Sequence, residues 1–380
     1  MDPRARSLQN LAVDLSEGFG ESERSDAVAQ IEAFGLSVEE RDGADDRTLA
    51  WIDLVFGGTW SSEAFKGANV VARRSGAPVG FATYDPIGFT YRWLRKMGTQ
   101  PGIGIFGPIG VAPGERGGGI GPQLLTLALC GLRRRGYATA LIPAVGEERL
   151  VAYYMEHSGA RVVEQFDRAA WQKERVRAVV MASGAGSNFA ALERRITEGW
   201  LPLDIAAIVT NRANAGVVSL AKRAGVPVVV LPWNREQESR EHYDAHLRQA
   251  VSGLSAQLVL LLGWMHLLDA DFIDAFPEIL NLHPAFMPLD PARDDVGMPD
   301  GSVGPVFRGI HAVRDAVNAG ARWIGATVHH VTADADRGPV VVRKPLQLQP
   351  ADDADEAYAR LRPIERALVR QAIVAWTYEH

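Results

Sequence analysis

The sequence contains very little cysteine, since Cys130 is the single cysteine among 380 residues. One thiol excludes an internal disulfide framework and a cysteine-rich metal site, and we expect no bound metal. Cys130 lies in the helical apolar stretch LLTLALCGLRRRG, so we expect it to pack inside a core. The chain also lacks an apolar run of the roughly 20 residues that a membrane helix needs. Its first twenty residues lack the apolar centre of a signal peptide. These absences predict a cytoplasmic protein with no membrane partner.

An excess of positive charge is missing as well. The formal net charge is -6 at pH 7, which argues against nucleic acid as the main partner, because that binding uses a basic surface. Hydrophobic residues make up 47% of the chain and charged residues 23%, the composition of an ordinary globular protein. A chain of this length comfortably forms two domains.

The first half of the chain predicts one mixed α and β domain. Residues 1–36 are polar and receive no role, and we expect the domain to span residues 37–172. Within it we expect a hairpin that turns at Ser75 and Gly76, because a short Ser-Gly turn separates two apolar runs. Further on, a strand over residues 104–111 leads through a glycine-rich turn into a helix over 122–136. The polar stretch 167–175 marks the end of the domain.

Residues 173–380 alternate apolar runs with helical stretches. We expect strands over 176–183, 205–210, 226–232, 257–263 and 278–284, with helices over 189–200 and 216–225 between them. Continuous apolar strands are typical of parallel sheets that are covered on both faces. The pattern therefore predicts a doubly wound, Rossmann-like α/β sheet, whose ligands lie beyond the carboxyl ends of the strands.

A first glycine-rich turn, RGGGIG, joins the strand over 104–111 to the following helix. Glycines let such a turn bring several backbone N–H groups against an anion. The stretch resembles the GNAT acetyltransferase family, whose Arg/Gln-x-x-Gly-x-Gly/Ala signature is filled by Arg116, Gly119 and Gly121. The resemblance covers roughly residues 37–167 and implies an α+β domain with a mixed sheet. It also implies that acetyl-CoA or another acyl-CoA is bound, with contacts from Val111, Arg116, Gly117, Gly119 and Gly121.

A pair of tyrosines follows in the stretch YYMEHSGA. The GNAT family typically has an aromatic pair before a glycine, and Tyr153 and Tyr154 occupy these positions. The resemblance implies that Tyr154 protonates the departing coenzyme A thiolate, a task that suits a neutral phenol. Four residues separate Tyr154 from Gly159, whereas a spacing of three is commoner in the family. With the shorter spacing, Met155 would occupy the position of the tyrosine. A packing role for Tyr154 is the alternative.

A second glycine-rich turn, SGAGSN over residues 183–188, ends the first strand of the second half. It lacks both the Gly-Lys-Ser/Thr ending of a nucleoside-triphosphate loop and the third glycine of a dinucleotide fingerprint, so a smaller anion fits better. Further on, Asn281 and His283 lie two residues apart on an expected strand. The two-residue period of a strand sends both side chains to one face, at the end where chemistry is expected.

Together with GWMHLL, LNLHPAFMP and TVHHVTADADRGPV, this turn makes residues 176–378 similar to the 10-formyltetrahydrofolate-dependent formyltransferases, most of all their phosphoribosylglycinamide branch. The resemblance implies transfer of a formyl group from 10-formyltetrahydrofolate to a small-molecule acceptor amine. It implies that Asn281 stabilises the oxyanion and that His283 is the catalytic acid. Asp336 would pair with the imidazole and favour its protonated form, with Asp334 as the competing carboxylate.

The same resemblance implies which residues bind the two substrates. The folate would be bound by Arg240, Met265, His266, Leu267, Leu268, Thr332 and Asp334. The acceptor would be bound by Gly186, Ser187, Asn188, Phe189, Arg362 and Glu365. The chain departs from the family at His266, where arginine is common, and at residues 289–306, where the family has only a few residues. We expect this insert to cover the site like a lid and to alter the acceptor pocket.

These observations predict a bifunctional acyltransferase of a specialised biosynthetic pathway. The second domain would formylate a small anionic amine or a hydrazine-like acceptor, and the first would transfer an acyl group from coenzyme A. Three alternatives stay open: a purine-pathway phosphoribosylglycinamide formyltransferase with an appended domain, a hydrolase that releases the formyl group to water, and a formyltransferase whose first domain is a non-catalytic acyl-CoA-binding scaffold. The sequence leaves the oligomeric state open, a homodimer included.

Overall fold

The computed structural model describes residues 7–87, 100–167, 175–276 and 278–379. The chain forms two compact units. Unit 1 comprises residues 1–172, 298–302 and 376–380, and unit 2 comprises residues 173–297 and 303–375. The division after residue 172 falls in the polar stretch 167–175, of which residues 168–174 lie outside the described residues. Within the described ranges, no helix combines the length and the apolar character needed to cross a membrane.

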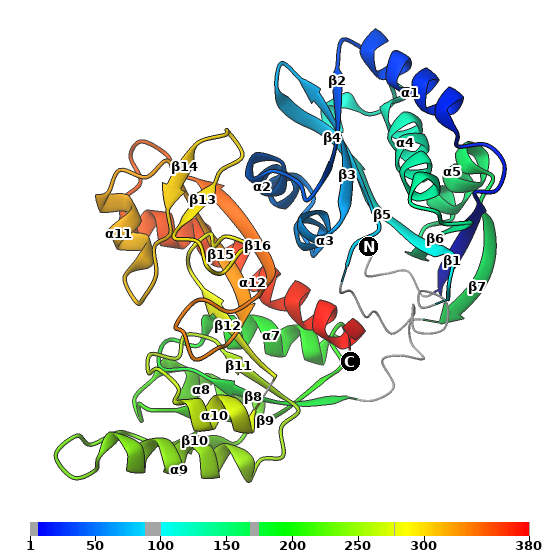
Figure 1. Ribbon diagram of the computed structural model, residues 1–380. Coiled ribbons are helices and arrows are strands. Elements are labelled where there is room, and N and C mark those ends of the chain that lie inside the picture. The colour runs from blue at the N-terminus through cyan, green and yellow to red at the C-terminus, as the bar shows by residue number, and fades with distance from the viewer. Residues whose placement is uncertain (1–6, 88–99, 168–174, 277, 380) are drawn as a thin grey trace. The chain divides into compact units, whose positions relative to one another are not determined.

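Unit 1 contains a seven-stranded sheet with the strand order β2-β3-β4-β5-β6-β1-β7 (Figure 1). Its strands are β1 (Ser7–Asp14), β2 (Ser37–Asp42), β3 (Ala68–Arg74), β4 (Ala77–Tyr84), β5 (Ile103–Val111), β6 (Thr139–Val145) and β7 (Arg161–Asp167). Its helices are α1 (Glu21–Ala33), α2 (Asp46–Val55), α3 (Trp60–Lys66), α4 (Ile120–Arg134) and α5 (Glu148–Ser158). The expected hairpin between β3 and β4 is confirmed, as is the buried position of Cys130 in α4.

Residues 7–14 and 21–33, within the stretch that received no role from the sequence, form β1 of this sheet and the helix α1. β1 pairs antiparallel with both β6 and β7, and α1 packs against α4 (Figure 1). Leu11, Val13 and Ile31 are fully or almost fully buried in the core of unit 1. The few apolar residues of this polar stretch are therefore the ones that fix it to the sheet.

The sheet of unit 1 opens between β5 and β6. These parallel strands pair only through Ile103–Ile105 and Thr139–Leu141. The carboxyl half of β5 pairs with β4 alone, and that of β6 pairs with β1. The opening lies at the end of β5 that leads into the glycine-rich turn.

Unit 2 contains a second seven-stranded sheet, with the order β10-β9-β8-β11-β12-β15-β16. Its strands are β8 (Val176–Met181), β9 (Leu203–Thr210), β10 (Val228–Val230), β11 (Leu258–Leu261), β12 (Ile279–His283), β15 (Trp323–His330) and β16 (Val340–Gln347). The strands from β10 to β12 are parallel, as expected, whereas β15 and β16 add an antiparallel edge that the apolar pattern did not indicate. The insert 289–306 contains a small hairpin of β13 (Asp295–Gly297) and β14 (Val303–Pro305).

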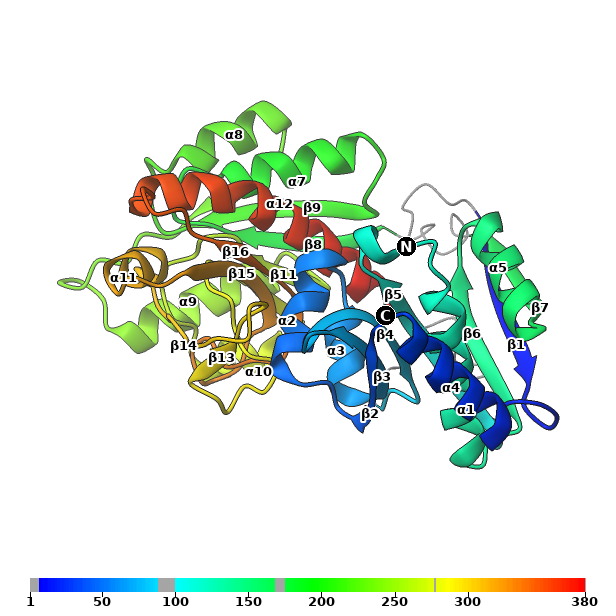
Figure 2. The same cartoon turned by 90° about the horizontal axis from the view of Figure 1, so that it is seen from above.

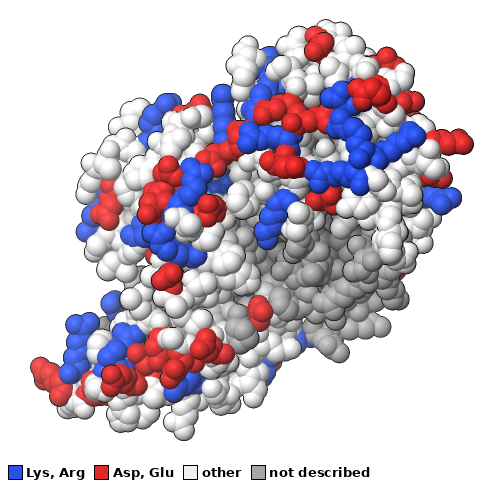
Figure 3. Space-filling view, in the orientation of Figure 1, with Lys and Arg blue, Asp and Glu red and all other residues white. Residues whose placement is uncertain are grey.

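Helices cover both faces of the second sheet. They are α7 (Ser187–Thr197), α8 (Gly216–Ala224), α9 (Arg240–Ser252), α10 (Ala270–Ala275), α11 (Ala312–Asn318) and α12 (Ala354–Glu379). Figure 2 shows α7 and α8 on one face and α9 and α10 on the other, which is the arrangement that crossovers between parallel strands produce. On the face in Figure 3, acidic and basic side chains of the described residues are interspersed and form no single basic field.

Candidate active sites

A cavity of about 400 Å³ lies at the carboxyl ends of β11 and β12 in unit 2. Its walls contain side chains from several motifs that the sequence singled out in this half of the chain. They include Asn188, the loop Gly263–Leu268, Asn281 with His283, Asp336, and Glu365. Up to 177 positions of sequence separate residues that meet here, such as Asn188 and Glu365. The fold therefore gathers the expected catalytic residues of this half and part of the expected binding residues at one place.

His283 is buried at the end of β12, with only 5% of its surface exposed. Its Nε2–H donates to the carbonyl oxygen of Phe307 over 3.1 Å, because a carbonyl can only accept. Nδ1 therefore carries the lone pair, and it lies 3.6 Å from Oδ1 of Asp336. Burial lowers the pKa of His283 and outweighs the Asp336 carboxylate, which acts in the opposite direction. Asp336 thus favours the protonated form of this imidazole, as the resemblance implies, but burial has the larger effect on its pKa.

Asp336 stands at the bottom of the same cavity and is ionised at neutral pH. Its Oδ2 accepts a hydrogen bond from the backbone N–H of Gly309 over 3.2 Å. Burial alone would raise the pKa of Asp336. The contact with the His329 imidazole, the charge of His283 and the Gly309 bond outweigh it and lower the pKa to about 2. A permanent carboxylate thus faces a neutral imidazole that can become charged.

Asn281 is hydrogen-bonded to His329, a histidine to which the sequence motifs assigned no role. Its Nδ2 donates to Nε2 of His329 over 3.1 Å and to Oδ1 of Asp336 over 3.4 Å. His329 is buried, and its Nδ1–H donates to the carbonyl of His330 over 2.7 Å, which leaves Nε2 free to accept. The signal was present in the motif TVHHV, because the antiparallel register pairs Asn281 with His329. The motif could not assign this role to His329, because the sequence did not show that β15 lies next to β12.

The loop expected to bind the folate lines the cavity with apolar groups. Met265, His266, Leu267, Leu268 and Thr332 belong to the cavity wall. Met265 is 46% exposed and Leu267 is 69% exposed, so their apolar surface is available to a flat heterocycle. Asp334 is not part of this wall, although the hydroxyl of Thr332 donates to its carbonyl oxygen over 3.1 Å.

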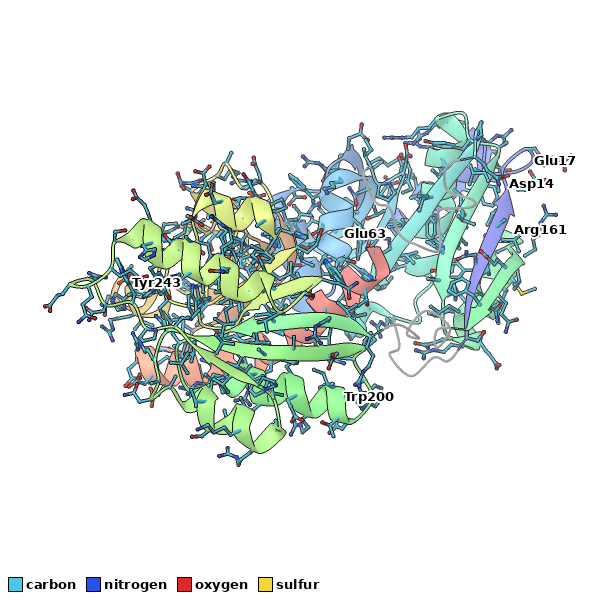
Figure 4. All side chains as sticks on the ribbon, turned by 90° about the horizontal axis from the view of Figure 1, so that it is seen from below. Asp14, Glu17, Glu63, Arg161, Trp200 and Tyr243 are labelled. Atoms are coloured by element: carbon cyan, nitrogen blue, oxygen red, sulfur yellow. The ribbon has the colours of Figure 1, made fainter. Side chains whose placement is uncertain are left out.

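Arg240 supports this loop from α9, and His266 fixes it from within the loop. Nη2 of Arg240 donates to the carbonyl oxygen of Leu267, and Nε donates to Asp244 over 2.6 Å. Arg240 is not among the residues of the cavity wall, so it holds the loop in place. His266 accepts a hydrogen bond from Nδ2 of Asn211 over 2.9 Å, and its ring packs near that of Tyr243, which Figure 4 labels on α9.

The residues expected to bind the acceptor divide into two groups. Asn188 and Glu365 line the cavity, and Nδ2 of Asn188 donates to Oε2 of Glu365 over 3.3 Å. Burial raises the pKa of Glu365, and the Asn188 bond only partly opposes it. The other four, Gly186, Ser187, Phe189 and Arg362, are not among the wall residues.

Three of those four form the start of α7. Gly186 has a φ of 75° and precedes the helix, and an added Cβ would lie 2.7 Å from Cα of Val217. The first N–H groups of a helix have no partner within it, so Ser187 and Phe189 can each offer a backbone donor to an anion. The side chain of Phe189 is buried and packs in the core. Arg362 is exposed on α12, where it stacks over the Tyr358 ring.

In unit 1, the expected acyl-CoA turn connects β5 to α4. Nε of Arg116 donates to the carbonyl oxygen of Val111 over 3.0 Å and closes the turn. Gly117 has a φ of 84°, and Gly119, which precedes the helix, has a φ of 88°. These left-handed conformations favour glycine. The amide groups at the start of α4 are thus directed beyond the end of β5, where a pyrophosphate is expected.

The two tyrosines of unit 1 occupy different surroundings. Tyr154 is 8% exposed, burial raises its pKa, and its ring packs edge-on against Phe106. Tyr153 lies at the turn, because a Cβ added to Gly121 would be 3.0 Å from its hydroxyl oxygen, and burial raises its pKa to about 12. Met155, which would take the tyrosine position with the shorter spacing to Gly159, is 50% exposed. Both phenols are neutral at pH 7 and able to donate a proton.

One group of side chains outside these sites has the composition of a metal site. Among the described residues, Glu238, His242 and His246 place potential ligand atoms within 4.8 Å of one another around the start of α9. Both histidines are exposed, and Nδ1 of His246 lies 2.9 Å from Oε1 of Glu238. An ordinary hydrogen bond or ion pair explains this contact.

Comparisons with known proteins agree with the two resemblances. The formyl transferase family model matches residues 176–290 and 300–373, and the acetyltransferase (GNAT) family model matches residues 27–160. The gap in the first match, residues 291–299, falls inside the insert. Formyl transferases use 10-formyltetrahydrofolate, and GNAT domains use acetyl-CoA or another acyl-CoA.

Individual relatives match about half of the chain. Phosphoribosylglycinamide formyltransferase of Mycobacterium tuberculosis is 30% identical over 200 residues, which are 52% of this chain and 84% of the relative. The chloroplastic phosphoribosylglycinamide formyltransferase of Arabidopsis thaliana is 26% identical over 219 residues, 57% of this chain and 71% of the relative. The structure of glycinamide ribonucleotide transformylase 1 from Symbiobacterium toebii aligns with a TM-score of 0.47 and 30% identity, over 53% of this chain and 87% of that one. The chain belongs to the formyl transferase family and carries a GNAT acetyltransferase domain in its N-terminal half.

Proposed function

We propose that unit 2 transfers the formyl group of 10-formyltetrahydrofolate to the amine of a small anionic acceptor. The observation that carries this proposal is the single cavity in which Asn281, His283 and Asp336 meet the apolar loop and the pair of Asn188 and Glu365. Unit 1 would transfer an acyl group from coenzyme A to an amine of the same molecule or of a related intermediate. Two transferases on one chain fit a specialised biosynthetic pathway.

The geometry supports a proton-transfer role for His283. The bound folate supplies the formyl carbon that the acceptor amine attacks. Nδ1 of neutral His283 takes the proton that the attacking amine loses, and Asp336, 3.6 Å away, stabilises the imidazolium. His283 then gives this proton to the nitrogen that leaves the formyl carbon, so it ends the cycle neutral. The burial that lowers its pKa therefore suits a residue that must first act as a base.

Asn281 is suited to stabilise the negative charge that develops on the formyl oxygen. Its Nδ2 makes two hydrogen bonds in the structure, and the bond to Asp336, at 3.4 Å, is the longer. A formyl oxygen can replace that weaker contact, while the bond to His329 keeps the amide in orientation. A fixed amide donor at this position is the usual way to stabilise an oxyanion.

The acceptor is expected to carry both an amine and an anionic group. The start of α7 offers backbone N–H groups to a phosphate, phosphonate or carboxylate. Asn188 and Glu365 lie in the cavity and are suited to bind the polar groups next to the amine. The insert 289–306 lengthens the family's loop beside His283, which favours an acceptor other than phosphoribosylglycinamide.

Steady-state kinetics with 10-formyltetrahydrofolate and a panel of acceptors test the proposal. The panel contains phosphoribosylglycinamide, small anionic amines and anionic hydrazines, and formyl release to water is measured without an acceptor. We expect a small anionic amine or hydrazine to have the highest kcat/KM. If phosphoribosylglycinamide is the best acceptor by a wide margin, the protein is a purine enzyme with an appended domain. Release to water that no acceptor accelerates would identify a hydrolase.

A scaffold role for unit 1 is the second candidate function. The burial of Tyr154 against Phe106 favours it, because a phenol enclosed by packing has little access to a thiolate. Turnover of acetyl-CoA and other acyl-CoA compounds with the same acceptors separates the two possibilities. Binding of coenzyme A without turnover of any acyl-CoA would support the scaffold role.

A further inference from the structure

Arg308 connects the insert 289–306 to the loop that contains Asp336. Nη1 of Arg308 donates to Oδ1 of Asp294 over 2.7 Å, and Nη2 donates to the carbonyl oxygen of Arg293 over 2.8 Å. Nε of the same guanidinium donates to the carbonyl oxygen of Asp336 over 3.3 Å. The planar fork of Arg308 thus joins two residues of the insert to the backbone of the catalytic aspartate.

A second arginine strengthens the connection from the other side. Arg337, the residue after Asp336, donates through Nη1 to the carbonyl oxygen of Pro291 over 3.1 Å and through Nη2 to Oδ1 of Asp294. Asp294 therefore accepts from both arginines, and its carboxylate lies between them. It is the one acidic side chain that these contacts place between the insert and the loop of Asp336.

The neighbours of Arg308 contact both catalytic side chains directly. The carbonyl of Phe307 accepts the Nε2–H of His283, which leaves the lone pair on Nδ1. The N–H of Gly309 donates to Oδ2 of Asp336, which orients the carboxylate. Any movement of residues 307–309 would change the position of His283 and that of Asp336 together.

We propose that Arg308 is a positioning residue for formyl transfer, and that the insert acts through Asp294 to hold it. The insert then has a mechanical role at the loop of Asp336. The guanidinium of Arg308 fixes the short segment 307–309, and this segment sets the tautomer of His283 and the orientation of Asp336. The kinetic part of this inference rests on the proposed function of unit 2.

A purely electrostatic role of Arg308 gives different expectations. The charged and titratable groups that act on His283 are Asp336, His329 and Arg308, and the positive charge of Arg308 helps to lower the pKa of His283. Arg308→Lys keeps this charge but cannot reach three acceptors in one plane. If only the charge matters, Arg308→Lys should keep the activity of the wild type. If the geometry of the guanidinium matters, Arg308→Lys should lose activity.

The kinetic experiment uses the full chain with the best acceptor of the panel. For Arg308→Lys we expect kcat to fall by about ten- to a hundredfold with little change in either KM, because small displacements of catalytic groups cost this much. Asp294→Asn should lower kcat by about two- to fivefold, since the ion pairs of this exposed carboxylate are weaker. Asp295→Asn is the matched control, because it removes the neighbouring carboxylate, which pairs with Arg293. An unchanged kcat in Arg308→Lys, or equal losses in the two aspartate variants, would overturn the proposal.

A second measurement is independent of any acceptor. In the unliganded protein, the His283 imidazole is titrated by NMR and identified by the signal that His283→Ala removes. Arg308→Lys should lower the pKa of His283, because Asp336, which raises it, is no longer held in place. Asp295→Asn should leave this pKa unchanged. A loss of thermal stability in Arg308→Lys without a change in this pKa would indicate a merely structural role and overturn the proposal. If no acceptor is formylated by the wild type but the pKa shifts as expected, the proposed function fails and the positioning role stands.

Discussion

Both halves of the molecule contain a glycine-rich turn that starts a helix, yet the two turns have different neighbours. Gly119 precedes α4 and Gly186 precedes α7, each in the left-handed conformation. Near α7, the fold gathers ionisable groups whose pKa values are shifted in different directions. The pKa values of Asp336 and His283 are lowered, and that of Glu365 is raised. Near α4, the candidate groups are two phenols whose pKa values are both raised by burial.

The comparison shows that the turn and its surroundings determine different properties of a site. A turn of this kind indicates where an anion is bound, because it presents unpaired backbone N–H groups. The chemistry depends on the side chains that other strands bring to the turn. Carboxylates and imidazoles with separated pKa values are typical of acid–base catalysis, whereas a buried phenol is equally compatible with packing. The following predictions test this contrast, beginning with the largest expected effect.

Replacement of His283 by alanine should lower formyl transfer by about 10²–10⁴, the usual contribution of an acid–base group. Asp336→Asn should lower it by at least about 10², because the imidazolium loses its carboxylate partner. Both are measured as kcat/KM for the acceptor. Binding of coenzyme A, measured by calorimetry, is the control and should be unchanged, since the two motif sets belong to different units. Nearly normal formyl transfer in His283→Ala would remove the basis of the proposed mechanism.

The pH dependence of formyl transfer should follow His283. The reaction needs the neutral imidazole, and burial lowers the pKa of His283 below 6.5. The acid limb of kcat/KM should therefore lie below pH 6.5, with a plateau at neutral pH. In Asp336→Asn the limb should move to still lower pH, because the removed carboxylate raises this pKa. An acid limb that does not move in Asp336→Asn would contradict the assignment.

Replacement of Tyr154 by phenylalanine tests whether unit 1 is catalytic. If Tyr154 protonates the thiolate, Tyr154→Phe should lower acyl-transfer kcat by about 10² with the KM for acyl-CoA little changed. Tyr153→Phe is the matched comparison. Its hydroxyl lies at the turn, so this variant should raise the KM by no more than about tenfold, the effect of one neutral hydrogen bond. Equal, small effects of both changes on acyl transfer would leave Tyr154 with a packing role only.

The acceptor site predicts a smaller effect for Asn188. Asn188→Ala removes a side-chain donor that faces Glu365 in the cavity. Losing a hydrogen bond to a charged group costs about 1.5–3 kcal/mol, or roughly ten- to a hundredfold in the KM for the acceptor. The KM for 10-formyltetrahydrofolate should barely change, because the folate loop lies elsewhere in the cavity. An equal loss for both substrates would indicate that Asn188 supports the cavity as a whole.

The sequence predicted this molecule well wherever local pattern decides structure. The hairpin at Ser75 and Gly76 and the five parallel strands of unit 2 follow from apolar periodicity and turn residues. Residues 7–14 escaped prediction, because β1 obtains its place from pairing with strands more than a hundred residues away. The antiparallel edge of β15 and β16 was missed as well, because the apolar pattern of unit 2 indicated parallel strands only.

The candidate site shows the same limit in its side chains. Motifs identified His283 and Asp336, and the structure brings them together. The protonation of His283 could not be predicted, because burial, which no motif reveals, outweighs the nearby carboxylate. His329 and Arg308 were missed because their roles depend on a strand register and on an insert. Contacts that link distant segments carry information that residue spacing alone does not.

The smallest effect is expected at Gly121, the last glycine of the turn in unit 1. Gly121 lies inside α4 and has no left-handed φ, so alanine is conformationally allowed there. The added Cβ would lie 3.0 Å from the hydroxyl oxygen of Tyr153, which is the end of a side chain and can move. Because alanine also favours the helix by about 1 kcal/mol, the two effects should nearly cancel. Chemical denaturation of Gly121→Ala should therefore change the free energy of unfolding by less than about 1 kcal/mol. Gly186→Ala is the counterpart in the other turn, where a positive φ and the Val217 backbone prevent such an adjustment, and its loss of stability should be clearly larger. If both alanines cost the same, the two turns differ less in their packing than the structure indicates.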